Sequence, residues 1–211
     1  VADGEPTEAG REVTVTLTDE FIKSNSPKTI YCKEAKIGAD TVYSGGADLT
    51  YIISGDVYEG YVLYINGTGN MSNYGTGESS APWIKSGYST SIKRVVVADG
   101  VTSIGNYGLA YLTNNSIQID LGNTITTIKD NAFYSDKIST ITIPATVTNI
   151  SSSALTNSKS LTEVVNNSSV QVDLPSIDKK SWYVDGDADR TPITKLASGK
   201  TARLGDASSG S

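Results

Sequence analysis

The sequence predicts a β-rich α/β solenoid, in which short strands from successive coils stack side by side. Three observations lead to this fold class: a recurring apolar pattern, a nearly constant spacing between its copies, and turn-rich polar segments on either side. The pattern runs from Ile92 to Leu109, returns at 119–133 and 138–155, and opens a fourth time at Leu161 before it decays. The first strand position steps from 95 to 119, 141 and 164, so the period is 22–24 residues.

Each coil contains one clear strand signal. Val95 and Val97 occupy alternate positions, which predicts a strand over residues 94–98, with equivalents at 118–122 and 140–144. Strands one period apart stack in parallel. The stretches 104–109 and 128–133 are expected to form a helix-like or irregular turn on the opposite side. A period of this length with this apolar core is typical of a right-handed leucine-rich-repeat solenoid.

The repeat divides the chain of 211 residues into four parts. Residues 1–37 are a polar lead-in with one strand at 13–17, and residues 38–90 form an N-terminal β cap with a hairpin of strands at 49–53 and 61–65. Residues 91–165 are the solenoid, with three full coils and a partial fourth. Residues 166–211 are a small C-terminal β extension with a strand at 170–174 and a frayed tail from Asp206. Caps are expected because an end coil would otherwise expose its apolar face.

Composition excludes several classes of function. The net charge of −6 disfavours nucleic acid and anionic membranes as partners. The chain has no histidine and a single cysteine, Cys32, which removes histidine-dependent triads and most transition-metal sites. The carboxylates fall at different registers of the coil, and Asp185–Asp189 departs from a calcium loop in its sixth and twelfth positions. We therefore expect no enzyme activity, no cofactor and no metal.

Several motifs carry a family resemblance. The run from Leu63 to Met71, the triplet 81–83 (Ala-Pro-Trp) and the stretch 101–105, followed by Ala132-Phe133 and Ile143-Pro144, resemble the BspA-type leucine-rich-repeat proteins of bacteria. The chain departs from that family at Leu112 and Asp136, where a small residue or cysteine is usual, and in its few coils. The resemblance implies a secreted or cell-surface protein associated with adhesion. No stretch is long and apolar enough to span a bilayer, and because the chain begins with Val1 we expect that a signal peptide has been removed.

Two surfaces are candidates for binding. The first is the outward face of the solenoid sheet, which we expect to be concave. Alternation along the strands places seven residues there: Arg94, Val96, Gln118, Asp120, Thr140, Thr142 and Glu163. The second is the aromatic cap, with Tyr51, Tyr61, Tyr64, Tyr74 and Trp83, which either binds a ligand or packs the cap itself. The leading function is adhesive binding of a protein on a host or neighbouring cell. Carbohydrate binding by the cap and a purely structural spacer are the alternatives.

Overall fold

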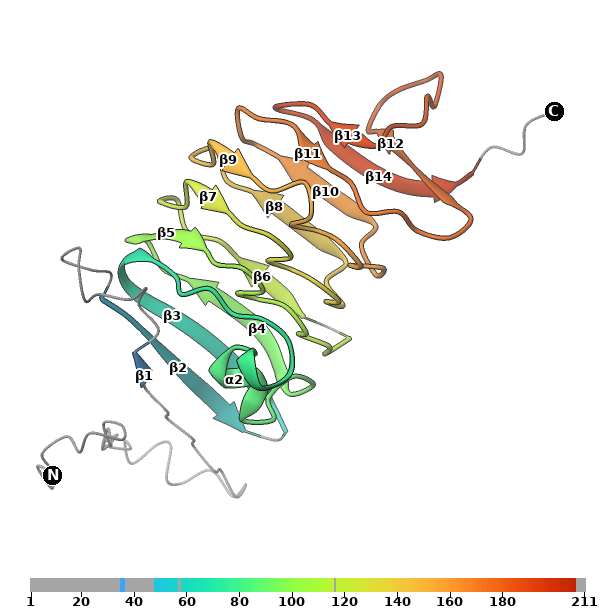
Figure 1. The fold of residues 1–211 in the computed structure, drawn as a ribbon. Helices are drawn as coiled ribbons and strands as arrows, with labels where there is room; N and C mark the ends of the chain where they lie inside the picture. Colours follow the sequence, from blue (N-terminus) through green and yellow to red (C-terminus); the bar gives the residue numbers. More distant parts are fainter. Residues whose placement is uncertain (1–34, 37–47, 57, 116, 208–211) are drawn as a thin grey trace, which may run out of the picture.

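The computed structural model describes residues 35–36, 48–56, 58–115 and 117–207, and in these the chain is a stack of coils with strands on two faces (Figure 1). The expected strand at 13–17 and Cys32 lie outside the described residues. Helix is confined, among the described residues, to the four-residue α2 (Pro82–Lys85) and the 3-10 turn η1 (Gly77–Ser79). The α/β label is therefore corrected to a sheet-rich solenoid. The stretches 104–109 and 128–133 form turns rather than helix.

The N-terminal part is built around a hairpin. β2 (Asp48–Asp56) pairs antiparallel with β3 (Gly60–Asn70), and the short β1 (Ala35–Lys36) pairs with β2. β3 then pairs in parallel with both β4 (Ile92–Val97) and β5 (Val101–Ile104). The two strands expected at 49–53 and 61–65 are thus present, and the second of them belongs to both faces of the first coil.

Each coil contributes strands to two faces. The front face contains β4, β6 (Gln118–Asp120), β8 (Thr140–Ile143) and β10 (Glu163–Asn166), at the positions predicted from the repeat. The second face contains β5, β7 (Thr127–Ile128) and β9 (Asn149–Ile150), which pair in parallel in that order. The sequence pattern did not predict this second strand, because β7 and β9 have only two residues each and show no alternation.

The C-terminal part extends the front sheet by antiparallel pairing. β14 (Thr201–Asp206) pairs with β10 on one side and with β12 (Lys180–Val184) on the other. β11 (Val172–Asp173) and β13 (Lys195–Leu196) form a separate two-stranded ladder. Asp206, expected to begin a frayed tail, is instead the last residue of β14 and lies opposite Lys180.

One apolar core runs through the stack from the hairpin to the C-terminal strands. Equivalent residues of successive coils form inward rows: Val95, Ile119, Ile141 and Val164 on the front side, and Leu109, Phe133 and Leu155 on the turn side. Burying such a side chain stabilises the fold by roughly 1.5–3 kcal/mol, whereas ordering each backbone residue costs about 1–2 kcal/mol. A coil of 22–24 residues therefore depends on its neighbours.

The packing of Gly105 gives a test of the junction between the hairpin and the first coil. A Cβ at this position would lie 2.0 Å from the backbone oxygen of Ser72. We expect Gly105→Ala to lower the free energy of unfolding by about 1–3 kcal/mol, because the backbone must shift to relieve the overlap. In Gly75→Ala the new methyl meets only the Ser79 side chain, at 3.2 Å. This control is expected to change stability by less than about 1 kcal/mol. Equal effects in urea unfolding would contradict the close approach.

Candidate binding surfaces

The seven residues predicted on the sheet face all point outward. Their neighbours Val95, Ile119, Ile141 and Val164 are buried, as strict alternation along a strand requires. Register places Arg94 beside Gln118 and Val96 beside Asp120. It places Thr140 beside Glu163, with Thr142 in the next row. The structure therefore brings the seven together as two groups on one face, which we call the front face.

A break in the front sheet separates these two groups. β4 pairs with β6 and β8 pairs with β10, but β6 and β8 form no ladder among the described strands. An opening of about 350 Å³ lies between them, lined mainly by Gln118, Asp120, Ser139, Thr140 and Thr142. The break lies in the coil from 119 to 141, which at 22 residues is the shortest of the series.

Arginines hold the carboxylates of the front face. Arg94 Nη2 lies 2.7 Å from Asp120 Oδ2, and its Nε donates to the same oxygen at 2.7 Å. Arg203 contacts Glu163 at 2.6 Å and Asp185 at 3.1 Å. Pairs this exposed contribute about 0–1 kcal/mol to stability. Their main effect is to fix the positions of charges on the surface.

Tyr64 connects the two surfaces predicted from the sequence. It is 37% exposed and lies in register with Ile52 on one side and Val96 on the other, and Val96 lies in register with Asp120. Ile52 and Val96 are half-buried. The row from Ile52 through Tyr64 to Val96 is thus an apolar strip, and the Arg94–Asp120 ion pair borders it.

Of the other cap aromatics, three are core residues and Tyr74 packs against the core, so packing rather than binding is the role the structure gives them. Tyr51 and Trp83 have no exposed surface and Tyr61 is 5% exposed. The rings pack edge to face, with centroids 5.4 Å apart for Tyr51–Trp83 and 5.9 Å apart for Tyr74–Trp83. Burial raises the pKa of Tyr51 and of the half-buried Tyr74. A small cap needs large side chains to fill its interior. Tyrosine and tryptophan also suit binding surfaces, so the sequence could not distinguish packing from binding.

Asp136 is a buried carboxyl with a structural role. It accepts a hydrogen bond from the Leu112 backbone N–H at 2.8 Å, while its Oδ2 is buried with no partner within the described residues. Burial raises its pKa well above the usual 3.8, and the Leu112 bond only partly opposes this. One period later, Ser158 donates to the Phe133 carbonyl at 2.6 Å. Both side chains join one turn to the preceding coil.

The raised pKa of Asp136 predicts a dependence of stability on pH. The unfolded chain releases this proton near pH 3.8, whereas the folded protein retains it. The contribution of Asp136 to stability is therefore complete below that pH and falls as the pH rises toward the folded pKa. We expect Asp136→Asn, a neutral isostere, to gain stability relative to the parent as the pH rises from 4 to 7, by up to about 1.4 kcal/mol per pH unit.

Urea unfolding across this pH range measures the effect, with Asp178→Asn as the matched exposed control. A stability difference between parent and Asp136→Asn that stays constant from pH 4 to 7 would contradict a buried, protonated carboxyl. The control variant is expected to follow the parent at every pH, because Asp178 is exposed.

The acidic turn at 185–189 makes ordinary turn contacts. The Asp187 carboxylate accepts from the backbone N–H groups of Asp189 and Thr191 at 3.1 and 3.0 Å. In the part of the chain that the structure describes, no three histidine, cysteine or acidic side chains gather into a group able to hold a metal ion. Within those same residues, no helix is long and apolar enough to cross a membrane.

The stacked coils, with one parallel strand row on each of two faces, define a leucine-rich-repeat solenoid. A family model confirms the resemblance seen in the sequence: residues 86–181 match the model of a BspA-type leucine-rich-repeat region, as six copies. The match extends past the expected end of the repeat at 165. Among curated proteins, none matches the chain at a significant level.

Solved structures of bacterial repeat proteins are similar to parts of the chain. A leucine-rich repeat protein from Eubacterium ventriosum is 20% identical, with a TM-score of 0.37, over 70% of this chain and 46% of that one. One from Bacteroides capillosus is 24% identical, with a TM-score of 0.28, over 48% and 83%. A leucine rich cell surface protein from Faecalibacterium prausnitzii is 14% identical, with a TM-score of 0.32, over 65% and 57%. The chain thus spans less than half the length of the first of these.

Proposed function

We propose that the chain is a non-catalytic binding module of a bacterial cell-surface or secreted protein, and that it recognises a protein through the front face. The observation that carries this proposal is the strip of Ile52, Tyr64 and Val96 beside the Arg94–Asp120 pair. Tyrosine and arginine are, with tryptophan, the residues enriched at the energetic centres of protein interfaces. Here they stand on a paired sheet, which holds them in fixed positions.

The chemistry of the front face favours binding over catalysis. Asp120 is held by Arg94, and Glu163 and Asp185 are both held by Arg203. General acid–base work needs a carboxyl whose pKa is tuned toward the working pH, typically by burial. The front-face carboxyls are instead exposed or half-buried and lie next to guanidinium groups. A partner with complementary charges could replace or extend these ion pairs, which would contribute to specificity.

The extracellular or surface location is part of the proposal and is supported by the BspA-type repeat. We further propose that the β2–β3 hairpin and the strands β12 and β14 serve as end caps. β3 pairs with both β4 and β5, and β14 joins the front sheet with reversed direction, so each element covers one end of a parallel ladder. Solenoids need such ends to avoid exposing apolar surface.

Removal of the Tyr64 ring tests the proposed interface. In biolayer interferometry against a panel of purified extracellular-matrix and bacterial surface proteins, we expect the parent chain to bind at least one protein. Tyr64→Ala is expected to weaken that binding about tenfold or more, which is the effect of losing an interface anchor. The free energy of unfolding should change little, because the Tyr64 ring is partly exposed to solvent.

Tyr58→Ala is the matched control, because Tyr58 is 70% exposed in the turn between β2 and β3, away from the strip. Arg94→Glu, which places two carboxylates side by side, is expected to weaken the same interaction and change its salt dependence. A bound protein whose affinity is equal for the parent, Tyr64→Ala and Arg94→Glu would refute the front-face assignment. No binding on the panel would favour a structural spacer.

A further inference from the structure

A second aromatic group lies on the turn side of the first two coils and is not part of the cap. Tyr107 and Tyr111 of the first coil have nearly parallel rings, 10° apart, with centroids 6.3 Å apart. Tyr134 of the second coil lies 5.7 Å from each of them. All three side chains are half-buried, so part of each ring faces solvent. We call these three residues the tyrosine cluster.

The backbone at two of these tyrosines is unusual. Tyr107 and Tyr111 have φ of 50° and 66°, in the left-handed region that bulky residues rarely adopt. Other coils place asparagine or serine at the equivalent positions, namely Asn131, Ser135 and Asn157, which also have positive φ. Asparagine tolerates this conformation better than tyrosine does. The first coil therefore holds aromatic rings where the fold alone would favour short polar residues, and such strain is a pointer to function.

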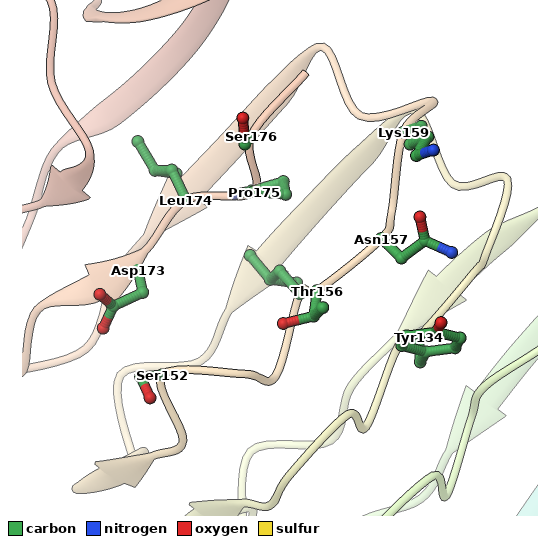
Figure 2. A pocket seen from close by; sticks show the side chains of 10 residues that line it. Tyr134, Ser152, Thr156, Asn157, Lys159, Asp173, Leu174, Pro175 and Ser176 are labelled. Carbon is green, nitrogen blue, oxygen red and sulfur yellow. The ribbon is translucent and has the colours of Figure 1, made fainter. Parts of the chain in front are cut away.

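A pocket of about 390 Å³ continues from the tyrosine cluster toward the C-terminal extension. Tyr134 belongs to both, and the remaining lining comes from the third coil at 152–159 and from residues 173–176. Figure 2 shows Tyr134 and Asp173 at opposite ends of this pocket, with Thr156 between them. Its volume is within the range of about 300–1,000 Å³ that ligand pockets occupy.

Residues 173–175, which line the pocket on the side of the C-terminal extension, are held in place by hydrogen bonds and an ion pair to residues outside the pocket. Trp182 Nε1 donates to the Pro175 carbonyl at 2.8 Å, and the Leu174 N–H donates to the Thr194 carbonyl at 2.9 Å. Asp173 pairs with Lys195 in the β11–β13 ladder, and their charged atoms lie 3.5 Å apart. Asn157 Nδ2 donates to Ser135 Oγ at 3.4 Å. Because these groups are held before any ligand arrives, little ordering is needed on binding.

We propose that the tyrosine cluster and this pocket together form a carbohydrate-binding site for an uncharged oligosaccharide. A pyranose ring has one face of C–H bonds, whose positive edge suits the negative face of an aromatic ring. Its hydroxyls donate and accept in pairs, which matches the amide of Asn157, the carboxylate of Asp173 and the hydroxyl of Thr156. The rings of the cluster supply the stacking surface, and the pocket supplies the polar groups.

The charges of the pocket favour a neutral sugar over a charged ligand. The charged lining residues are one of each sign, Asp173 and Lys159, so the lining carries no net charge. There is no apolar trough for a hydrophobic peptide side chain, since Leu155, Leu174 and Pro175 share the lining with seven polar or aromatic residues. An extended chain of sugar rings would lie from Tyr107 and Tyr111 across Tyr134 to Asp173. This site is independent of the protein-binding front face.

A glycan array of immobilised neutral oligosaccharides tests this site with the full chain, followed by titration calorimetry with the best oligosaccharide. We expect Tyr134→Ala to weaken binding about tenfold or more and Tyr134→Phe to retain most of it, because stacking requires the ring. Asp173→Asn is expected to weaken binding by a smaller factor, since an amide keeps one acceptor. Tyr64→Ala, on the front face, should leave glycan binding unchanged.

Three outcomes would overturn the proposal: no oligosaccharide bound at millimolar concentration, equal affinity for the parent and Tyr134→Ala, or equal loss in Tyr134→Ala and Tyr64→Ala. Far-ultraviolet circular dichroism and urea unfolding of every variant separate lost binding from lost folding. If Tyr134→Ala proves unfolded, Tyr111→Ala and Asp173→Asn test the same site at its two ends, and unchanged affinity in both would equally overturn the proposal.

Discussion

Hydrogen bonding between neighbouring coils is the constraint on which the rest of this structure depends. On the second face and on the turn side of the stack, backbone N–H groups donate to carbonyls of an adjacent coil. Examples are Thr126 to Thr102 at 2.9 Å, Ser151 to Ile128 at 2.9 Å and Phe133 to Ala154 at 3.0 Å. Buried backbone groups must find such partners. Since the inward apolar residues of one coil are too few to offset the entropy of ordering it, coils are stable only as a stack.

Stacking also decides where binding surfaces can arise. Residues one period apart form rows, so side chains far apart in the sequence lie side by side on the surface. On the front side the row through Tyr64, Val96 and Asp120 brings together an aromatic ring, an aliphatic side chain and a charge. On the turn side Tyr134 of one coil lies against Tyr107 and Tyr111 of the coil before it. The two surfaces thus use the same geometry on different sides.

The periodic features of this molecule could be predicted from the sequence, and the irregular ones could not. The apolar period located β4, β6, β8 and β10 and the outward direction of Arg94 and Gln118, because alternation along a strand has one solution when one face is buried. The burial of Tyr51 and Trp83 was open, since tyrosine and tryptophan suit both a core and an interface. The second strand of each coil was missed because β7 and β9 have two residues each.

The candidate sites followed the same division. The front-face residues repeat in two registers of the coil and could be listed in advance. The break between β6 and β8 accompanies one shorter coil and shows no alternation that could predict it. The tyrosine cluster was missed because its members do not share a register. Tyr107, Tyr111 and Tyr134 occupy three different positions of the repeat, and only the stacking of the turns brings them together.

Native-state hydrogen exchange tests the dependence of each coil on its neighbours most directly. If the stack is one cooperative unit, the amides of Thr126, Phe133 and Ser151 will exchange with the same free energy of opening, equal to that of global unfolding in urea. They will also respond to urea with the same slope. Exchange of one coil's amides through an opening of much lower free energy, insensitive to urea, would show that coils open singly and would contradict this account.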